Sequence, residues 1–203
     1  FPTDKGDIIF NGTNARAKKV HELVKQGIAR TFQNVELFES MTVLENVLVG
    51  QHARTRCGMW GSGFRFPWVR HEEARAAKIA FELLDFIGLK EHALRKSGDL
   101  AFGWQRLLEL ARALASGPRL LLLDEPAAGL NMVETMQLGD LIRKVRDQGI
   151  TILLVEHDMS LTMEISDAIV VLDQGKKIAQ GSPRSIQENE AVMRAYLGTS
   201  PQK

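Results

Sequence analysis

The chain has 203 residues, of which 44% are hydrophobic and 25% are charged, a balance that is typical of an ordinary globular protein. Its 26 Lys and Arg residues and 25 Asp and Glu residues leave a net charge of +1, so the composition gives no general electrostatic basis for binding nucleic acid. Cys57 is the only cysteine, which excludes an internal disulfide and a metal cluster built on cysteine, and no apolar run is long enough for a membrane-spanning helix.

The first part of the chain reads as two strands around a short helix. Residues 7–10 predict a strand that ends in the turn Asn11-Gly12, and residues 28–32 predict a second strand. A short helix or turn is expected between them, over residues 20–27. Because the sequence enters the first strand almost at once, we expect that a preceding part of the same domain is missing from it.

The middle of the chain is predicted to be helical. Thr42-Val43-Leu44-Glu45 is a capping box, in which the first and last side chains satisfy N–H groups at the start of a helix. A strong helical pattern covers residues 72–87 and ends at Gly88, and another covers residues 104–116. Residues 54–70 are irregular and rich in Trp and Phe. This aromatic insertion either docks on a membrane partner or folds back as local core.

The last third alternates strands with helices, which predicts a βαβ sheet. Strands are expected over residues 119–124, 151–156, 168–173 and 177–180, with a hairpin turn at Gln174-Gly175 between the last two and helices over residues 132–148 and 160–166. We therefore expect two units. Residues 1–33 and 118–203 form an α/β core, and residues 34–117 form a helical subdomain that includes the aromatic insertion.

A pair of carboxylates follows the apolar run Leu120–Leu123. A short run of this kind indicates a strand buried on both faces of a parallel sheet, and ligands lie outside the carboxyl ends of such strands. Asp124 and Glu125 are therefore expected at the mouth of a site. Because adjacent buried carboxylates are costly without a cation, the pair indicates a metal ion or a polarised water, as in the metal site of a nucleoside triphosphatase.

Four more motifs surround this pair in a fixed order. They are Phe32-Gln33, Leu100-Ala101-Phe102-Gly103-Trp104, Ala128-Gly129-Leu130-Asn131, and His157 after a predicted strand. With these motifs the chain resembles the ATP-binding subunit of an ABC transporter, in which they correspond to the Q-loop, the signature, the D-loop and the switch histidine, with residues 120–125 as the Walker B strand. The resemblance implies an α/β P-loop NTPase (RecA-like) fold with a mostly parallel sheet and an ABC-type helical subdomain.

A finer resemblance points to one of the two ATPase subunits of branched-chain amino acid importers. It rests on four segments, Gly27–Gln33, Asp124–Asn131, Glu156–Met159 and Ala195–Gly198. Lipopolysaccharide-export ATPases share the Tyr-Leu-Gly ending and are the alternative. The importer resemblance implies ATP and Mg²⁺ as cofactors, with a second ATPase subunit and transmembrane permease subunits as partners. It also implies no nucleic acid partner and a peripheral place on the cytoplasmic face of the inner membrane.

The resemblance further implies a role for each site residue. Asp124 would hold the Mg²⁺ ion that offsets charge on the phosphates, and Glu125 would act as general base on the attacking water. Gln33 would touch both the metal ion and the water. His157 would contact the γ-phosphate and orient the base, and the D-loop, residues 128–131, would lie at the nucleotide.

The signature, residues 100–104, is expected to serve the nucleotide of a partner subunit, because the start of a helix offers free N–H groups to a phosphate. Gly103 keeps the close backbone approach that this requires, whereas Ala101 lacks a hydroxyl and Phe102 replaces a common glycine. Trp104 allows two interpretations. Its indole either occludes the phosphate site and weakens hydrolysis, or packs on the surface of the helical subdomain.

No Gly-x-x-x-x-Gly-Lys-Ser/Thr loop occurs in the sequence. That loop supplies the backbone cradle and the lysine for the phosphates, so we expect an N-terminally truncated ATPase that, as it stands, binds ATP poorly. A chromosome-maintenance ATPase is disfavoured, because the stretch from Gln33 to Leu100 contains no heptads for a coiled coil. A non-hydrolysing regulatory relative is a further alternative. The missing loop and Trp104 favour it, and the intact acidic pair and switch histidine oppose it.

Overall fold

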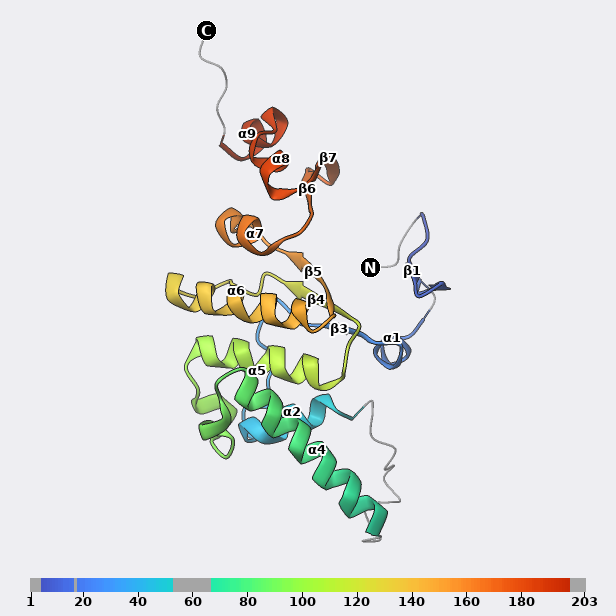
Figure 1. Ribbon diagram of the computed structural model, residues 1–203, viewed down its shortest axis with the longest axis vertical. Coiled ribbons are helices and arrows are strands. Elements are labelled where there is room, and N and C mark those ends of the chain that lie inside the picture. Colours follow the sequence, from blue (N-terminus) through green and yellow to red (C-terminus); the bar gives the residue numbers. More distant parts are fainter. Residues whose placement is uncertain (1–4, 17, 53–66, 198–203) are drawn as a thin grey trace.

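The computed structural model describes residues 5–16, 18–52 and 67–197. A three-stranded parallel sheet lies in the middle of this part of the chain, with the helices α5, α2 and α4 on one side and the C-terminal elements beyond the other (Figure 1). The helices are α1 (Val20–Gln26), α2 (Val43–Gly50), α4 (Pro67–Phe86), α5 (Phe102–Ala115), α6 (Met132–Asp147), α7 (Met159–Ile165), α8 (Pro183–Gln187) and α9 (Glu190–Leu197). The strands are β1 (Ile9–Phe10), β2 (Thr13–Asn14), β3 (Ile28–Arg30), β4 (Leu120–Asp124), β5 (Thr151–Val155), β6 (Ile169–Asp173) and β7 (Lys176–Gly181).

Strands β3, β4 and β5 are parallel neighbours in that order, which confirms the predicted parallel sheet. Leu121 and Leu123 of β4 are buried in one core with apolar side chains of α5 and α6. The prediction that the run Leu120–Leu123 is buried on both faces is wrong for the described residues, because Leu122 is only half-buried and Leu153 on β5 is 57% exposed. The reason is that α5 and α6 both pack on the face of Leu121.

Helices α2, α4 and α5 pack against one another to form the helical layer (Figure 1). The predicted capping box of α2 is confirmed. Thr42 Oγ1 accepts a hydrogen bond from the N–H of Glu45 (3.2 Å), and the Glu45 carboxylate accepts one from the N–H of Thr42 (2.7 Å). Gly50 lies so close to α5 that a Cβ would overlap the carbonyl oxygen of Arg112, so the contact between α2 and α5 requires glycine here.

Helix α4 begins earlier than the sequence pattern predicts. The pattern indicates a start at Glu72, whereas the helix starts at Pro67. Proline fits the first turn of a helix, because the N–H that it lacks would have no partner there. Residues 67–70 were assigned to the irregular insertion, and this part of the prediction is wrong. The rest of the insertion, residues 54–66, lies outside the described residues.

The C-terminal elements form a small unit with its own core. Strands β6 and β7 are antiparallel, and the φ angles of Gln174 (46°) and Gly175 (76°) are both positive, as a tight hairpin turn requires. The predicted turn at these two residues is therefore confirmed. Helices α8 and α9 contact β7 and share a buried apolar cluster with the hairpin.

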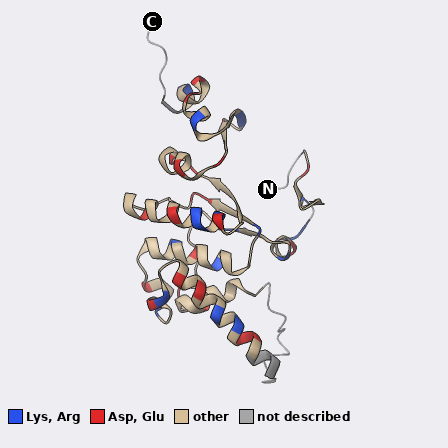
Figure 2. Ribbon diagram, viewed as in Figure 1, with Lys and Arg blue, Asp and Glu red and all other residues tan. Residues whose placement is uncertain are grey.

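Charged residues of both signs are mixed along the long helices. Figure 2 shows basic and acidic positions following one another on α4 and α6. Among the described residues, no helix combines the length and the apolar composition that crossing a membrane would need. The described surface therefore has mixed charge on these two helices, and no helix in it is built to span lipid.

Candidate functional site

The carboxyl ends of β3, β4 and β5 meet at one edge of the sheet and bring three predicted site residues together. Gln33 Nε2 donates a hydrogen bond to Glu125 Oε2 at 2.9 Å. His157 Nδ1 lies 3.9 Å from the same oxygen. Residues that are far apart in the sequence thus surround one carboxylate, which remains partly open to solvent.

The backbone of Glu125 adopts a left-handed conformation, with φ at 46°. Such a conformation costs a non-glycine residue about 1–3 kcal/mol and persists only where neighbouring contacts hold it. Here the N–H of Glu125 donates to the carbonyl oxygen of Val155 at 2.8 Å, which ties the residue to the end of β5. The strained turn therefore holds the carboxylate within reach of Gln33 and His157.

Asp124, the last residue of β4, is paired with a cation from the neighbouring strand. Arg30 Nη2 donates to Asp124 Oδ2 at 2.8 Å, and both side chains are partly exposed. A pair of this kind contributes only about 0–1 kcal/mol, because water screens it. The Asp124 carboxylate can therefore exchange Arg30 for another cation at small cost.

The chemistry of these side chains fits a Mg²⁺ ion. Asp124 offers a carboxylate, and Gln33 keeps its amide oxygen because it uses its N–H toward Glu125. Both are the hard oxygen donors that Mg²⁺ prefers. In the described part of the chain no three His, Cys, Asp or Glu side chains are grouped closely enough to hold a metal ion. This is compatible with Mg²⁺, which commonly uses one or two protein ligands and completes its shell with water and phosphate oxygens.

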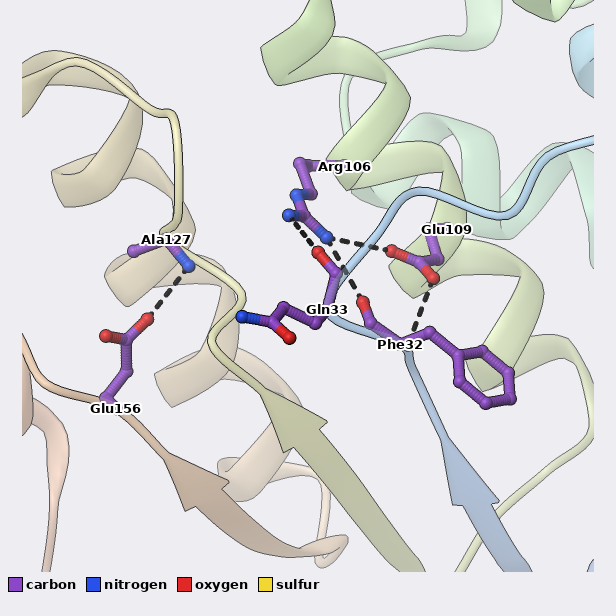
Figure 3. Close-up of polar contacts among 6 residues, drawn as sticks. All are labelled: Phe32, Gln33, Arg106, Glu109, Ala127 and Glu156. Carbon is purple, nitrogen blue, oxygen red and sulfur yellow. Dashed lines mark hydrogen bonds and ion pairs between the residues drawn. The ribbon is translucent and has the colours of Figure 1, made fainter.

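Glu156 is a further residue of the site, and the sequence motifs assign it no role. Its Oε1 accepts a hydrogen bond from the N–H of Ala127 (2.9 Å), and its Oε2 accepts from the N–H groups of His157 (3.0 Å) and Asp158 (3.3 Å). Figure 3 shows the carboxylate facing Ala127 across the end of the sheet. Glu156 therefore joins the segment after Glu125 to the loop that carries His157. The sequence signal that could have identified Glu156 is an acidic residue at the end of a predicted strand, directly before His157.

Arg106 and Glu109 of α5 hold the backbone at Gln33 (Figure 3). Arg106 Nη2 donates to the carbonyl oxygen of Gln33 at 2.6 Å, and Nη1 donates to that of Phe32 at 3.2 Å. Glu109 Oε1 accepts from the N–H of Phe32 at 3.2 Å. Both side chains are almost fully buried. The sequence motifs assign no role to Arg106, because helical periodicity does not reveal which carbonyl group a guanidinium reaches.

Burial raises the pKa of Glu109, although the hydrogen bond from Phe32 and the nearby Arg106 and Arg112 act in the opposite direction. Burial also lowers the pKa of Arg112, which Glu109 and Glu36 partly oppose. The charged groups of this helix face are therefore held in a poorly solvated environment.

The D-loop, residues 128–131, packs against the beginning of α5 within the same chain. A Cβ on Gly129, whose φ is 82°, would lie 2.8 Å from the ring of Phe102. Asn131 is the N-cap of α6: its side chain accepts from the N–H of Glu134 (3.0 Å), while Glu134 accepts from the N–H of Asn131 (2.9 Å). This capping box fixes the end of the D-loop.

The signature residues 100–104 form the entrance to α5. Leu100 is buried, and Ala101 is the N-cap of the helix without a side-chain hydrogen bond. Gly103 is buried against Glu134, so that a Cβ would overlap the Glu134 carboxylate. The close approach that Gly103 permits in this structure is thus to α6 of the same chain.

Trp104 packs on the surface of the helical layer, as in the second of its two interpretations. Its ring centroid lies 4.5 Å from that of His92, with an angle of 32° between the ring planes. His92 belongs to a short 3₁₀ helix, Lys90–His92. The indole is 40% exposed, so it covers His92 and also presents an apolar surface.

Comparison with known families gives two matches. Residues 1–128 match the family described as "ABC transporter". Residues 176–201, which include β7 and α8, match the family described as "Branched-chain amino acid ATP-binding cassette transporter". The two matches together span most of the chain, and the first covers the site residues from Gln33 to Glu125.

Curated relatives and solved structures agree with these matches. The "High-affinity branched-chain amino acid transport ATP-binding protein BraF" of Pseudomonas aeruginosa is 45% identical over 194 residues, which cover 95% of this chain and 76% of the relative. The corresponding protein LivG of Escherichia coli K12 is 44% identical with the same coverage. A nucleotide-free ATP-binding cassette from an ABC transporter superposes with a TM-score of 0.80 at 28% identity, covering 98% of this chain and 79% of that structure. A cassette in its ADP conformation gives 0.79 at 30% identity, with 97% and 78% covered.

Proposed function

The chain belongs to the ATP-binding subunit family of ABC transporters, and we propose that it is the ATP-hydrolysing motor of an importer for branched-chain amino acids. The names of BraF and LivG and the match over residues 176–201 support this substrate class. The observation that carries the proposal is the convergence of Gln33 and His157 on a single oxygen of Glu125.

In this proposal Glu125 is the general base. Its carboxylate accepts a proton from the water that attacks the γ-phosphate of ATP. Gln33 orients the carboxylate and the water through its amide, and the hydrogen bond at 2.9 Å supports that role. His157, which is 71% exposed, is free to contact the γ-phosphate.

Asp124 and Gln33 would hold the Mg²⁺ ion. When bound, the ion offsets negative charge on the phosphates. Before the ion binds, Arg30 pairs with Asp124. The positive charge of Arg30 then reduces the repulsion between the Asp124 carboxylate and the incoming nucleotide.

The signature, residues 100–104, would contact the nucleotide of a second ATPase subunit, and the D-loop, residues 128–131, would lie at the nucleotide. Their packing side by side at the entrance to α5 supports a single surface for that partner. Residues 1–33 and 118–203 would form the ATP-binding core, and residues 34–117 the helical subdomain that contacts the permease. The subunit would sit on the cytoplasmic face of the inner membrane, held there by its permease partners.

The sequence contains no Gly-x-x-x-x-Gly-Lys-Ser/Thr loop. We therefore propose that the isolated 203-residue chain binds ATP weakly and does not turn it over, and ATP hydrolysis is tested on the transporter assembled from the chromosomal gene product. The backbone cradle and the lysine of such a loop are main contacts for the phosphates in P-loop enzymes.

The proposal is tested by Glu125→Gln in the chromosomal gene. Uptake of labelled leucine is expected to fall by about 100-fold or more, because a glutamine cannot accept the proton of the attacking water. Glu188→Gln is the matched control, since Glu188 is an exposed residue of the C-terminal unit that pairs with Arg184. Unchanged leucine uptake in Glu125→Gln cells would contradict the proposal.

Two further experimental outcomes distinguish the proposed importer motor from an export ATPase and from a regulatory relative. Normal uptake after deletion of the whole gene would assign the subunit to another substrate, such as that of an export system. Normal leucine uptake together with no ATP hydrolysis by the purified wild-type transporter would favour a regulatory relative.

A further inference from the structure

We propose that Arg106 and Glu109 are positioning residues for Gln33, through which a displacement of α5 changes the rate of ATP hydrolysis. The inference rests on the proposed function, because it assigns to these residues an effect on the reaction at Glu125. Neither residue touches the reacting groups in the structure. Both act on the backbone of the segment that carries Gln33.

Three hydrogen bonds join side chains of α5 to the short backbone segment of Phe32 and Gln33. The Arg106 guanidinium donates to two successive carbonyl oxygens, those of Phe32 (3.2 Å) and Gln33 (2.6 Å). Glu109 accepts from the N–H of Phe32 (3.2 Å) and lies 3.5 Å from Arg106 Nη1. One helix face thus fixes three backbone groups at the end of β3.

The same segment, Phe32 and Gln33, ends in the site. The Gln33 carbonyl is bonded to Arg106, while its side-chain amide is bonded to Glu125. Only the short Gln33 side chain separates the two bonds. A shift of the Gln33 backbone by about 1 Å would therefore displace the amide from its present position 2.9 Å from Glu125 Oε2.

The burial of the Arg106–Glu109 pair favours a role in geometry over a role in stability. The Arg106 and Glu109 side chains are 5% and 4% exposed. A buried ion pair often gives no net stability relative to apolar residues of the same volume, because both charges have lost their water. Burial also raises the pKa of Glu109, so its charged form is disfavoured there. What the pair supplies is fixed geometry, and the segment that it fixes is the one with Gln33.

Helix α5 also carries the signature at its entrance. The Arg106 guanidinium lies 5.3 Å from the ring centroid of Phe102, and that ring packs against Gly129 of the D-loop. Contacts therefore run without a gap from the D-loop through the first turn of α5 to Gln33. A partner or nucleotide that shifts this turn would shift Gln33 with it.

Because spatial continuity alone does not establish coupling, the test is a double-mutant cycle. The steady-state rate of ATP hydrolysis is measured for the purified transporter with wild-type subunit, Arg106→Lys, Gln33→Ala, and both changes together. Lysine keeps the charge of Arg106 but cannot donate to two carbonyl oxygens in a fixed fork. We expect Arg106→Lys to lower kcat about tenfold in the wild-type background and less than about twofold in the Gln33→Ala background.

A purely structural role gives a different pattern. It would lower kcat by the same factor in both backgrounds, and equal factors would overturn the inference. The KM for ATP is expected to change less than about twofold, because the Arg106 guanidinium is bonded to the Phe32 and Gln33 backbone and is assigned no contact with a phosphate. A large rise of KM with unchanged kcat would also overturn it.

Controls keep the test decisive. Arg143→Lys is the matched exchange, because the ion-pair partners of Arg143 in the described part of the chain are Asp140 and Glu164 on α6 and α7, away from the Gln33 segment in the sequence. It is expected to leave kcat unchanged. Should Arg106→Lys lower the melting temperature, the cycle is carried out with Glu109→Gln, which keeps the shape of the side chain. A wild-type transporter without ATP hydrolysis would refute the proposed function, whereas an active wild type with equal factors would refute only this inference.

Discussion

The left-handed backbone of Glu125 places one carboxylate oxygen between an amide and an imidazole. The hydrogen bond from Gln33 leaves the carboxylate with less rotational freedom, and its N–H bond to Val155 fixes the turn. A general base is effective when its geometry is set before the substrate arrives. The strain at this residue is therefore consistent with preorganisation for proton abstraction.

Glu156 offers a direct test of how His157 is positioned. Glu156→Ala removes the acceptor for the N–H groups of Ala127, His157 and Asp158. We expect ATP hydrolysis by the assembled transporter to fall by about 10- to 100-fold, because small displacements of a catalytic group have effects of this size. Glu156→Gln retains one acceptor oxygen and should lose less activity.

Glu190→Ala provides the control for this change, since Glu190 is an exposed residue of α9 that contacts Arg194. Its hydrolysis rate should match that of the wild type. A rate for Glu156→Ala equal to that of the control would show that Glu156 does not position the histidine loop.

At the scale of single residues, the sequence allowed the convergence of Gln33, Glu125 and His157 to be anticipated. Each follows a predicted strand, and the carboxyl ends of parallel strands meet at one edge. The roles of Arg106 and Glu156 could not be anticipated in this way. Their partners are backbone groups, which carry no sequence signal, and the contact of Arg106 with Gln33 joins positions 73 residues apart.

At the scale of elements, α5 has one face in the core and one end at the site. Its buried face includes Leu108, Leu110 and Ala111, which pack in the same core as β4. The buried Arg106 and Glu109 interrupt this apolar face. The helix is therefore anchored by apolar packing and joined to the Gln33 segment by charged groups.

The pKa of Glu109 makes the stability of the protein depend on pH. Its folded-state pKa is raised above 4.5, so the folded protein binds this proton more tightly than the unfolded chain does. The stability that Glu109 contributes is full below pH 4.5 and is lost as the pH rises through the raised pKa. The melting temperature of the wild type minus that of Glu109→Gln should therefore fall as the pH rises from 4.5.

Thermal unfolding of the two proteins across that pH range checks this sign. Glutamine does not ionise, so the variant lacks this one contribution and shares all others. A difference in melting temperature that stays constant, or that rises with pH, would show that burial does not raise the pKa of Glu109.

Element boundaries were predicted where local chemistry determines them. The capping box at Thr42 and Glu45 and the turn at Gln174 and Gly175 are local signals, and both are confirmed. The start of α4 at Pro67 was missed, because aromatic and glycine residues just before it masked the helical pattern. The exposed face of the sheet was also missed, since an apolar run shows that a strand is buried but not from how many sides.

At the scale of the whole molecule, the site lies where the end of the sheet meets α5, as Figure 3 shows for Gln33 and Arg106. Gln33 follows β3 directly and is bonded both to the end of β4 and to α5. A movement of the helical layer relative to the sheet would therefore change the Gln33–Glu125 contact first. This is the geometry expected of a motor in which closure of the subunits controls hydrolysis.

The central claim is that the terminal phosphate of ATP binds at the tip of β4, between Gln33 and His157. The most direct measurement is an experimental structure of the transporter whose subunit carries Glu125→Gln, with ATP and Mg²⁺ bound. We predict that the γ-phosphate lies within hydrogen-bonding distance of His157 and that Gln33 lies beside it. A γ-phosphate bound elsewhere, with these two side chains on a surface free of nucleotide, would contradict the account.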